Sequence, residues 1–412
     1  MKAITFGCRL NTYETEVMKE HARKAGLDNV LIINTCAVTG EAERQARQAI
    51  RRARRENPEA RIIVTGCAAQ VHPDSFAAMP EVDQVIGNDL KLKAEAWSFS
   101  APSRVQVNDI MLVRETAGHM IGGLEGHTRA FVQVQNGCDH RCTFCIIPYG
   151  RGPSRSVAMG DIDGQVGELV AGGYQEIVLT GVDITSYGAD LPERPTLGQM
   201  TRRLLASAPE IKRLRLSSLD PAGIDGDLWE LIGNEPRLMP HLHLSMQAGD
   251  DMILKRMKRR HARSDLLAVC ARARRLRPDI VFGADIIAGF PTETDEMFEN
   301  TLSAARECGL TFLHVFPYSP RKGTPAAKMP QVEGTVRKER AKALRELGEG
   351  QLNKHLNGLV GKTVPVLTEK NNRGHTEYFS EVRIDHDTAA GQIVGVRVEG
   401  VGGGCLIGSM MG

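Results

Sequence analysis

The sequence of 412 residues lacks any apolar run of the about 20 residues that a transmembrane helix needs. The apolar stretch within residues 1–8 is only as long as a strand, too short for the core of a signal peptide. An excess of one charge is also missing, since 52 Lys and Arg face 50 Asp and Glu, a formal net charge of +2. We therefore expect a cytoplasmic protein whose surface as a whole does not attract polyanions.

A fourth cysteine is missing from an otherwise cysteine-rich loop. Residues 137–148 contain Cys138, Cys142 and Cys145 in the spacing C-x3-C-x2-C. A four-iron, four-sulfur cluster takes four thiolates, so three would leave one iron open to a substrate or cofactor. A zinc site with His140 as fourth ligand and a disulfide with one odd cysteine are the alternatives. Structural zinc sites usually take their ligands from two segments, so the pattern favours the cluster.

The length predicts two or three domains, of which the first is an open parallel α/β domain. Short β-branched strands are expected at residues 3–6, 30–33 and 62–64, with helical patterns between them, such as 41–56. Asn11, followed three residues later by Glu14, predicts an N-terminal capping box for the first helix.

Three more cysteines follow these strands. Cys8, Cys36 and Cys67 each lie one to three residues beyond a predicted strand. The carboxyl ends of parallel strands meet at one edge of a sheet, so the three thiols should converge there. This placement favours a second three-cysteine ligand set, and the alternative is three small buried hydrophobic residues.

A longer repeat of strand and helix runs from residue 129 to about 330 and predicts a complete or partial parallel barrel of six units. Its strands are expected at 130–134, 176–179, 213–216, 241–246, 280–287 and 311–318. Polar or small residues at the strand ends predict a bound polar cofactor across the barrel mouth, although each also suits a turn. They are Gly181, Asp183, Ser218, Gln247 and Asp285.

The last segment changes to strands, expected at 363–367, 376–384 and 393–398, and predicts a small all-β module. Such a module can offer RNA a groove, or it can be a structural cap. It ends in a glycine-rich segment, 400–404, with no clear last strand after it. We expect domains at 1–100, 127–355 and 356–412, with a connector at 101–126. Cys270, Cys308 and Cys405 are expected to be packing residues.

Basic residues gather in three runs, at 44–55, 255–263 and 272–277. Any one of them can be a solvated helix face, but several in a nearly neutral chain indicate a phosphate-rich partner.

Several of these segments resemble one known family. The C-x3-C-x2-C loop after the first strand of a partial barrel resembles the radical S-adenosylmethionine superfamily. Within it, the chain is most similar to the methylthiotransferases, and the resemblance covers nearly the whole chain, including a last segment that looks like their TRAM RNA-binding module. The matching segments are GCRLN at 7–11, NTC at 34–36, TGCAAQ at 65–70, QNGC at 135–138, RGPSRS at 151–156 and GFPTET at 289–294.

The resemblance implies two [4Fe-4S] clusters and S-adenosylmethionine as cofactors. Cys138, Cys142 and Cys145 would hold the cluster whose open iron binds S-adenosylmethionine and yields a 5′-deoxyadenosyl radical. Cys8, Cys36 and Cys67 would hold an auxiliary cluster that carries the sulfur to be inserted. No side chain acts as a nucleophile, because the cofactor performs the hard step. A reducing electron donor such as a flavodoxin or ferredoxin is implied.

Three branches of this family differ in substrate. They modify isopentenyladenosine in tRNA, threonylcarbamoyladenosine in tRNA, or an aspartate of a ribosomal protein. CRLNTYET at 8–15 and EAERQAR at 41–47 most resemble the threonylcarbamoyladenosine branch, whose target is adenosine 37 in the tRNA anticodon stem-loop. Alternatives of another class are a non-catalytic iron–sulfur protein that binds RNA and a zinc-binding RNA module. The sequence leaves the oligomeric state open.

Overall fold

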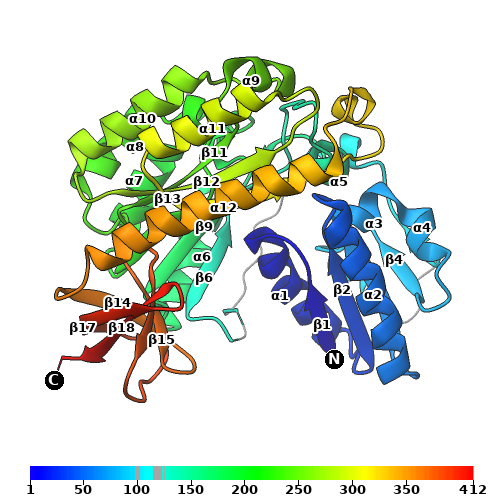
Figure 1. The fold of residues 1–412 in the computed structure, drawn as a ribbon. Coiled ribbons are helices and arrows are strands. Elements are labelled where there is room, and N and C mark those ends of the chain that lie inside the picture. The colour runs from blue at the N-terminus through cyan, green and yellow to red at the C-terminus, as the bar shows by residue number, and fades with distance from the viewer. Residues whose placement is uncertain (99–102, 115–122, 125, 412) are drawn as a thin grey trace.

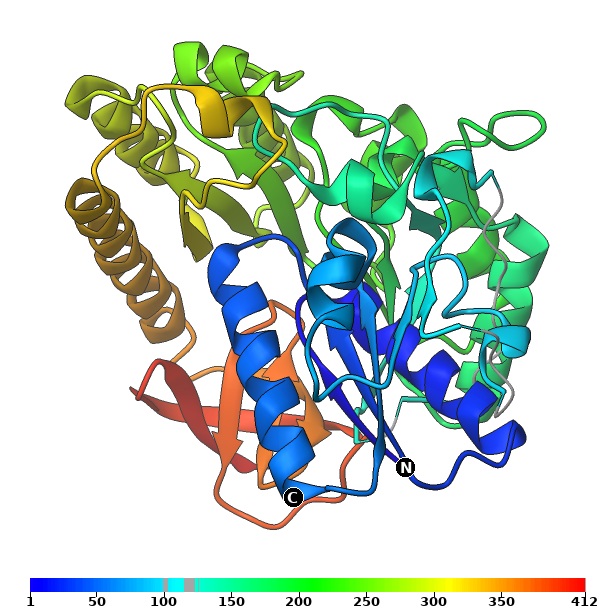
Figure 2. The ribbon, with the colours of Figure 1, turned by 90° about the vertical axis from the view of Figure 1, so that its right-hand side faces the viewer.

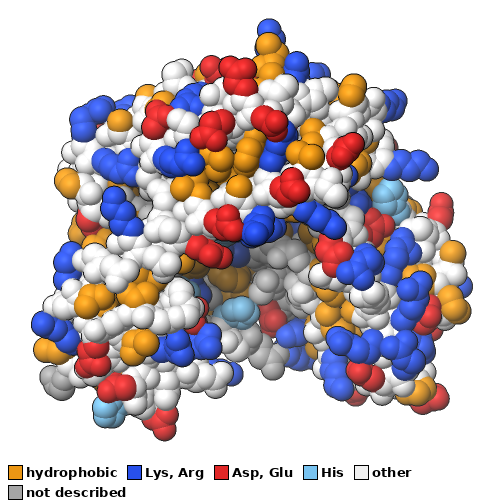
Figure 3. Space-filling model, in the orientation of Figure 1, with side chains coloured by type: hydrophobic (Ala, Val, Ile, Leu, Met, Phe, Trp, Pro, Cys, Tyr) orange, Lys and Arg blue, Asp and Glu red, His pale blue; other side chains and the backbone are white. Residues whose placement is uncertain are grey.

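The computed structural model describes residues 1–98, 103–114, 123–124 and 126–411. Three units surround a hollow. In Figure 1 the central barrel lies at the top, the N-terminal domain at the lower right and the C-terminal module at the lower left. The space-filling view in the same orientation shows the hollow between the two lower units, with charged and histidine side chains around it (Figure 3).

The N-terminal domain is an open parallel sheet in the order β1-β2-β3-β4-β5, as predicted. Every side chain of β2 is buried, as expected for a strand covered on both faces. Its fifth strand comes from the segment that the sequence assigned to the connector. The bounds are β1 Lys2–Thr5, α1 Arg9–Lys24, β2 Val30–Thr35, α2 Gly40–Glu56, β3 Arg61–Gly66, α3 Cys67–Val71, α4 Pro73–Ala77, β4 Gln84–Ile86 and β5 Val105–Gln106.

The first helix does not begin where the sequence suggested. Helix α1 starts at Arg9 with Cys8 as its N-cap, so Asn11 and Glu14 lie inside the helix and are buried. The Asn11 side chain instead donates to the carbonyls of Phe6 at 2.6 Å and Thr35 at 3.2 Å. The predicted capping box is wrong because both side chains serve long-range contacts.

The central region is a partial barrel of six parallel strands, as predicted. Two three-stranded sheets, β6-β9-β10 and β11-β12-β13, are joined where β10 and its following loop meet β11. The strands are β6 Arg129–Gln133, β9 Glu176–Thr180, β10 Arg213–Leu216, β11 His241–Gln247, β12 Val281–Ala288 and β13 Leu310–Pro317, with a small β7–β8 pair, Gln135–Asn136 and Arg155–Ser156. Apolar side chains from these strands and the outer helices form the largest core.

Helices cover the outside of this barrel (Figures 1 and 2). They are α6 Met159–Ala171, α7 Leu197–Ser207, α8 Gly226–Asn234, α9 Asp251–Met257, α10 Arg263–Leu276, α11 Asp295–Glu307 and α12 Gly334–Asn357. The short helix α5 Ile147–Arg151 instead lies between the barrel and α3 of the N-terminal domain. Helix α12 runs along β13 toward the C-terminal module. Gly348 allows this close packing, because a Cβ there would lie 3.1 Å from the Cβ of Leu313. Among the helices of the described residues, none has the length and hydropathy of a membrane span.

The C-terminal module is a closed five-stranded barrel in the order β14-β15-β16-β18-β17. The expectation that it lacks a last strand is wrong. Gly402 pairs with Cys405, and Gly403 and Gly404 between them adopt φ values of 63° and 77°. A two-residue hairpin turn needs positive φ at both positions, so the glycines begin the last strand rather than ending the fold. The strands are β14 Thr363–Glu369, β15 Arg373–Thr376, β16 Glu381–Ile384, β17 Ile393–Gly402 and β18 Cys405–Met410.

This module docks against the amino ends of the central strands. Arg213 donates to the carbonyls of Pro365 and His375 at 2.8 and 3.1 Å, and Arg215 donates to those of Thr376 and Glu377 at 2.8 and 2.9 Å. These bonds satisfy buried guanidinium groups, and they fix the module at one side of the hollow.

Candidate functional site

The Cys138–Cys145 loop leaves the barrel just after β6 and β7. Gly137 has a φ of +73°, and a Cβ there would lie 1.8 Å from the carbonyl oxygen of Pro153. Only glycine fits this approach, which lets the Cys138 amide donate to the carbonyl of Gly152 at 3.0 Å. The loop therefore starts from a fixed point at the carboxyl end of the barrel.

Contacts at the middle of the loop hold it against the barrel. The Thr143 hydroxyl donates to the carbonyl of Arg256 at 2.7 Å, and the Ala326 amide donates to the carbonyl of Thr143 at 2.9 Å. Arg259 lies with Nη1 3.5 Å from the Cys142 sulfur and Nη2 3.1 Å from Asp220 Oδ2. A cation that is itself fixed by a buried carboxylate thus lies beside one thiol of the loop.

The second cysteine set gathers at the carboxyl ends of β1, β2 and β3. Gly7 lies so close to Cys36 that an added Cβ would be 3.0 Å from its sulfur. Burial first, and then the charges of Cys67 and Cys8, raise the pKa of Cys36 to about 12, as expected for thiols that lie near one another. Cys36 and Cys67 are buried and Cys8 is exposed.

The two cysteine sets meet across helix α5. A Cβ on Gly150 of this helix would lie 3.2 Å from the Cβ of Cys67. Burial raises the pKa of Cys145 to about 12, and the charges of Cys142 and Cys67 add to the rise. One thiol from each set is therefore close enough to influence the other.

The distances between the thiols can be compared with the distance between two ligand atoms on a single zinc ion. Two thiolates on one zinc, each about 2.3 Å from it, lie at most about 4.6 Å apart. Within the described part of the chain, the single group whose ligand atoms all lie within 4.8 Å of one another is His243, Asp285 and His314, which contains no cysteine. The sulfur atoms of neither complete set therefore all lie within that distance of one another, and a set of three sulfur donors is the kind that an iron–sulfur cluster takes.

His140, the candidate fourth zinc ligand, lies beside a carboxylate. Its Nε2 is 2.9 Å from Asp183 Oδ2. Asp183 also accepts from the hydroxyls of Thr185 and Ser186 at 2.7 and 2.6 Å. Burial alone would raise the pKa of Asp183, but the bonds from His140 and Ser186 outweigh it and lower that pKa. Through its contact with Asp183, His140 helps to position the loop.

The structure separates the five predicted cofactor residues into two groups. Gly181 and Asp183 follow β9, Ser218 follows β10, and Gln247 ends β11 with a φ of 64°, so these four lie at strand ends. Asp285 lies inside β12 rather than at its end, because that strand continues to Ala288.

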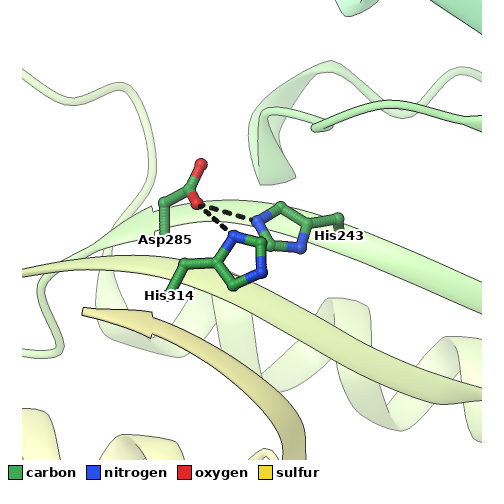
Figure 4. Close-up of side chains that lie close together, drawn as sticks. All are labelled: His243, Asp285 and His314. Atoms are coloured by element: carbon green, nitrogen blue, oxygen red, sulfur yellow. Dashed lines mark hydrogen bonds and ion pairs between the residues drawn. The ribbon is translucent and has the colours of Figure 1, made fainter. Parts of the chain in front are cut away.

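Asp285 belongs to a group that sequence reasoning missed. Its Oδ1 lies 2.9 Å from His243 Nε2 and 3.3 Å from His314 Nδ1, and the three side chains converge inside the barrel from β11, β12 and β13 (Figure 4). Burial would raise the pKa of Asp285, but the two histidines outweigh it and hold that pKa below its ordinary value. The signal was the alternation along each strand, which puts these residues on the inner face.

A buried ionic network joins the N-terminal domain to α5. Glu14 accepts from Arg151 Nη1 at 2.8 Å and from Lys91 Nζ at 2.6 Å, and all three side chains are at most 2% exposed. Arg151 also donates to Asn11 at 2.5 Å. Since α5 follows the cysteine loop and Asn11 bonds the carbonyl of Phe6 in the turn that leads into Cys8, this network fixes the two cysteine sets relative to each other.

We expect Glu14→Gln to destabilise the protein by about 3–5 kcal/mol, because it leaves two buried cations without their carboxylate. Burial opposes ionisation of Glu14, but Arg151 and Lys91 lower its pKa from 4.5 to about 2. Its contribution is therefore complete above pH 4.5 and is lost as the pH falls toward 2. Urea unfolding at pH 7 and at pH 3 measures both effects.

Glu20→Gln is the matched control, since Glu20 lies on the same helix in an exposed pair with Lys24. It should cost less than about 0.5 kcal/mol. Equal stability losses for the two variants would contradict the role of the network.

Most arginines of the second and third basic runs have internal partners. Arg256 donates to Thr292, Arg263 to Asn300, Arg274 to Cys308 and Arg277 to Leu238. The first run is different, since Arg51, Arg52 and Arg55 are exposed on α2 and basic side chains cover this part of the surface in Figure 3. Of the three basic runs, the one on α2 therefore remains the candidate for contact with a phosphate-rich partner.

Comparison with known proteins agrees with this arrangement. Residues 132–305 match the radical SAM superfamily, and residues 1–87 match an uncharacterised protein family, UPF0004. The chain is 56% identical to the threonylcarbamoyladenosine tRNA methylthiotransferase of Rickettsia prowazekii, over 97% of this chain and 94% of that one. It is 33% identical to that of Bacillus subtilis, over 96% and 92%. A tRNA-2-methylthio-N(6)-dimethylallyladenosine synthase of Maricaulis maris is 33% identical, over 99% and 96%.

Solved structures share the fold at low identity. The radical S-adenosylmethionine methyltransferase TsrM of Kitasatospora setae superposes with a TM-score of 0.56 at 16% identity, over 77% of this chain and 66% of that one. The cobalamin-dependent enzyme OxsB gives 0.51 at 11% identity, over 85% and 56%.

Proposed function

Because the chain belongs to the radical S-adenosylmethionine methylthiotransferase family, as its similarity to the Rickettsia relative shows, we propose that it places a methylthio group on carbon 2 of threonylcarbamoyladenosine. This membership confirms the resemblance found in the sequence. The proposed target is adenosine 37 of tRNA, next to the anticodon. The observation that carries the proposal is that two three-cysteine sets meet across α5 beside a hollow.

Each cysteine set fits one [4Fe-4S] cluster with an open iron. Cys138, Cys142 and Cys145 would hold the one that binds S-adenosylmethionine, and Cys8, Cys36 and Cys67 would hold the auxiliary one. When bound, the cofactors supply radical hydrogen abstraction from an unreactive aromatic carbon and the sulfur that replaces the hydrogen.

The chain itself orients and shields these groups. Arg259, held by Asp220, stabilises negative charge at Cys142. The Val182 and Asp183 amides donate to Gln135 Oε1 at 3.0 and 2.9 Å, which fixes the turn after β9. Gly181 allows this close packing, because a Cβ there would lie 2.7 Å from the carbonyl oxygen of Gln135. Asp183, Ser218 and Gln247 supply polar groups at the same rim, where they would bind S-adenosylmethionine. Asp285 lies deeper and is assigned to the substrate side.

The partners follow from this reaction. The tRNA anticodon stem-loop would enter the hollow between residues 1–100 and the RNA-binding module at 356–412, with the barrel of residues 127–355 above it. A flavodoxin or ferredoxin would supply electrons. A tRNA substrate places the protein in the cytoplasm.

We expect Arg51→Gln combined with Arg55→Gln to weaken tRNA binding. Each exposed arginine that contacts a phosphate contributes about 0.9 to the slope of log affinity against log salt, so the slope should fall by up to about 2. Filter binding at several salt concentrations measures it. Arg306→Gln is the control, because Arg306 is 53% exposed on α11, on the outer surface of the barrel. Equal slopes for the double variant and wild type would exclude α2 from the interface.

The function is tested with anaerobically reconstituted protein, S-adenosylmethionine, dithionite and two stem-loop RNAs. One RNA carries threonylcarbamoyladenosine and the other isopentenyladenosine at the target position. Mass spectrometry should find the methylthio product from the first. Turnover of the second alone would assign the chain to the other tRNA branch, and absence of 5′-deoxyadenosine would refute the radical reaction.

A further inference from the structure

Arg9 carries a positive charge that, among the described residues, has no carboxylate in contact with it. It is half-buried at the start of α1, directly after Cys8, with its Cζ 5.5 Å from the centre of the Phe379 ring. No hydrogen bond or ion pair joins its guanidinium to another residue in the described part of the chain. A half-buried guanidinium group without a hydrogen-bond partner can bind an anion.

The neighbouring arginines differ in having counterions. Arg129 Nη2 lies 2.8 Å from Glu369 Oε1, and Arg215 Nε lies 2.8 Å from Glu176 Oε1. Both arginines stack within 5.2 Å of the same Phe379 ring that Arg9 approaches. Among the guanidinium groups around this ring in the described part of the chain, that of Arg9 is the one without a contacting carboxylate, so an incoming anion would supply the missing partner.

The group of His243, Asp285 and His314 shares the interior with Arg9. The Phe379 ring that Arg9 approaches stacks on His241 at 5.4 Å between centroids, and the His241 ring lies 6.4 Å from that of His243. In the tautomers with hydrogen on His243 Nε2 and His314 Nδ1, both imidazoles donate toward one oxygen of Asp285 (Figure 4). This arrangement reduces the repulsion that Asp285 would exert on a second carboxylate. His314 remains 57% exposed and can hydrogen-bond a ligand.

We propose that Arg9 binds the carboxylate of the threonyl group of the substrate, opposite the wall formed by His243, Asp285 and His314. The inference rests on the proposed function and deepens it. The threonylcarbamoyl group ends in a carboxylate, and an isopentenyl group is uncharged. Because Arg9 follows a proposed ligand of the auxiliary cluster, a base whose carbon 2 faces that cluster brings its N6 substituent near Arg9. A guanidinium there selects the acidic substrate.

The test compares two stem-loop RNAs, one with threonylcarbamoyladenosine and one in which the threonyl carboxylate is a neutral carboxamide. Wild-type holoprotein should favour the acid by about 30-fold in kcat/KM, the range that a charge-assisted hydrogen bond supports. Arg9→Gln should raise KM for the acid about 30-fold and leave the amide unchanged, and Arg9→Lys should keep part of the preference. Lys24→Gln, an exposed charge loss on the same helix, should behave as wild type.

The outcomes separate the two proposals. Turnover of both RNAs at equal rates by wild type overturns the carboxylate site and leaves the proposed function standing. Turnover of neither RNA overturns both. If Arg9→Gln loses iron and slows both RNAs alike, Arg9 supports the cluster instead, and the carboxylate proposal is wrong.

Discussion

Replacing Cys142 by Ala should abolish both the cleavage of S-adenosylmethionine and the methylthiolation of RNA, with rates below about one thousandth of wild type, a barrier increase of about 4 kcal/mol or more. Cys142 is 9% exposed and lies 3.5 Å from Arg259, so no solvent thiol can readily replace it. Two thiolates would remain for a cluster that already lacks one ligand. High-performance liquid chromatography of 5′-deoxyadenosine, with and without RNA, measures the loss.

Cys270→Ala is the control for that result. Cys270 is 1% exposed on α10, so the variant also removes a buried thiol, but one that lies in the barrel core and outside both cysteine sets. Its activity should stay within about twofold of wild type. Cleavage of S-adenosylmethionine by the Cys142 variant at the wild-type rate would remove this cysteine from the proposed ligand set.

The part of the fold that follows local rules was predictable. Cys8, Cys36 and Cys67 could be placed together because parallel strands end at one edge, and the short apolar runs before them mark those strands. The six strands of the barrel were found for the same reason. The prediction was wrong at Gly403 and Gly404, because glycine ends some helices and strands but also forms the tightest hairpin turns between strands.

The parts that were missed depend on contacts between distant residues. Glu14 and Arg151 are 137 positions apart, and neither segment contains a local sequence pattern that predicts their ion pair. The short motif around Asn11 and Glu14 matched a helix cap, but burial against α5 decided the role of both side chains. Asp285 was grouped with the residues at strand ends although the expected strand, 280–287, already ran past it, and β12 continues to Ala288.

These long-range contacts explain how two separate folds can form one site. The network of Lys91, Glu14 and Arg151 locks α1 against α5, and it would cost several kcal/mol to break. The two cysteine sets are therefore held at a fixed separation before any substrate arrives. Such preorganisation matters most for a reaction in which one carbon must face two metal centres in turn.

Replacing Cys36 by Ala should remove methylthiolation by at least about a thousandfold while leaving S-adenosylmethionine cleavage without RNA within about twofold of wild type. Cys36 lies at the end of β2 among the thiols of the N-terminal domain, and Gly7 packs directly on it. Losing it removes one of three ligands from the auxiliary set and none from the Cys138–Cys145 loop. Iron content should fall by about half, which spectroscopy and metal analysis measure independently of turnover.

This prediction requires that methylthiolation is lost while the cleavage of S-adenosylmethionine is kept. That is a strict requirement, because the charge of Cys67 acts on Cys145 across α5. We expect the loop to survive, since its own anchoring bonds, from Thr143 to the carbonyl of Arg256 and from the Ala326 amide to the carbonyl of Thr143, do not involve Cys36. Cys308→Ala, another buried thiol outside both sets, should retain both activities. If the Cys36 variant lost cleavage together with sulfur insertion, the two clusters would be one cooperative unit. If the Cys36 variant methylthiolated RNA normally, the inserted sulfur would have to come from a source other than the proposed auxiliary cluster.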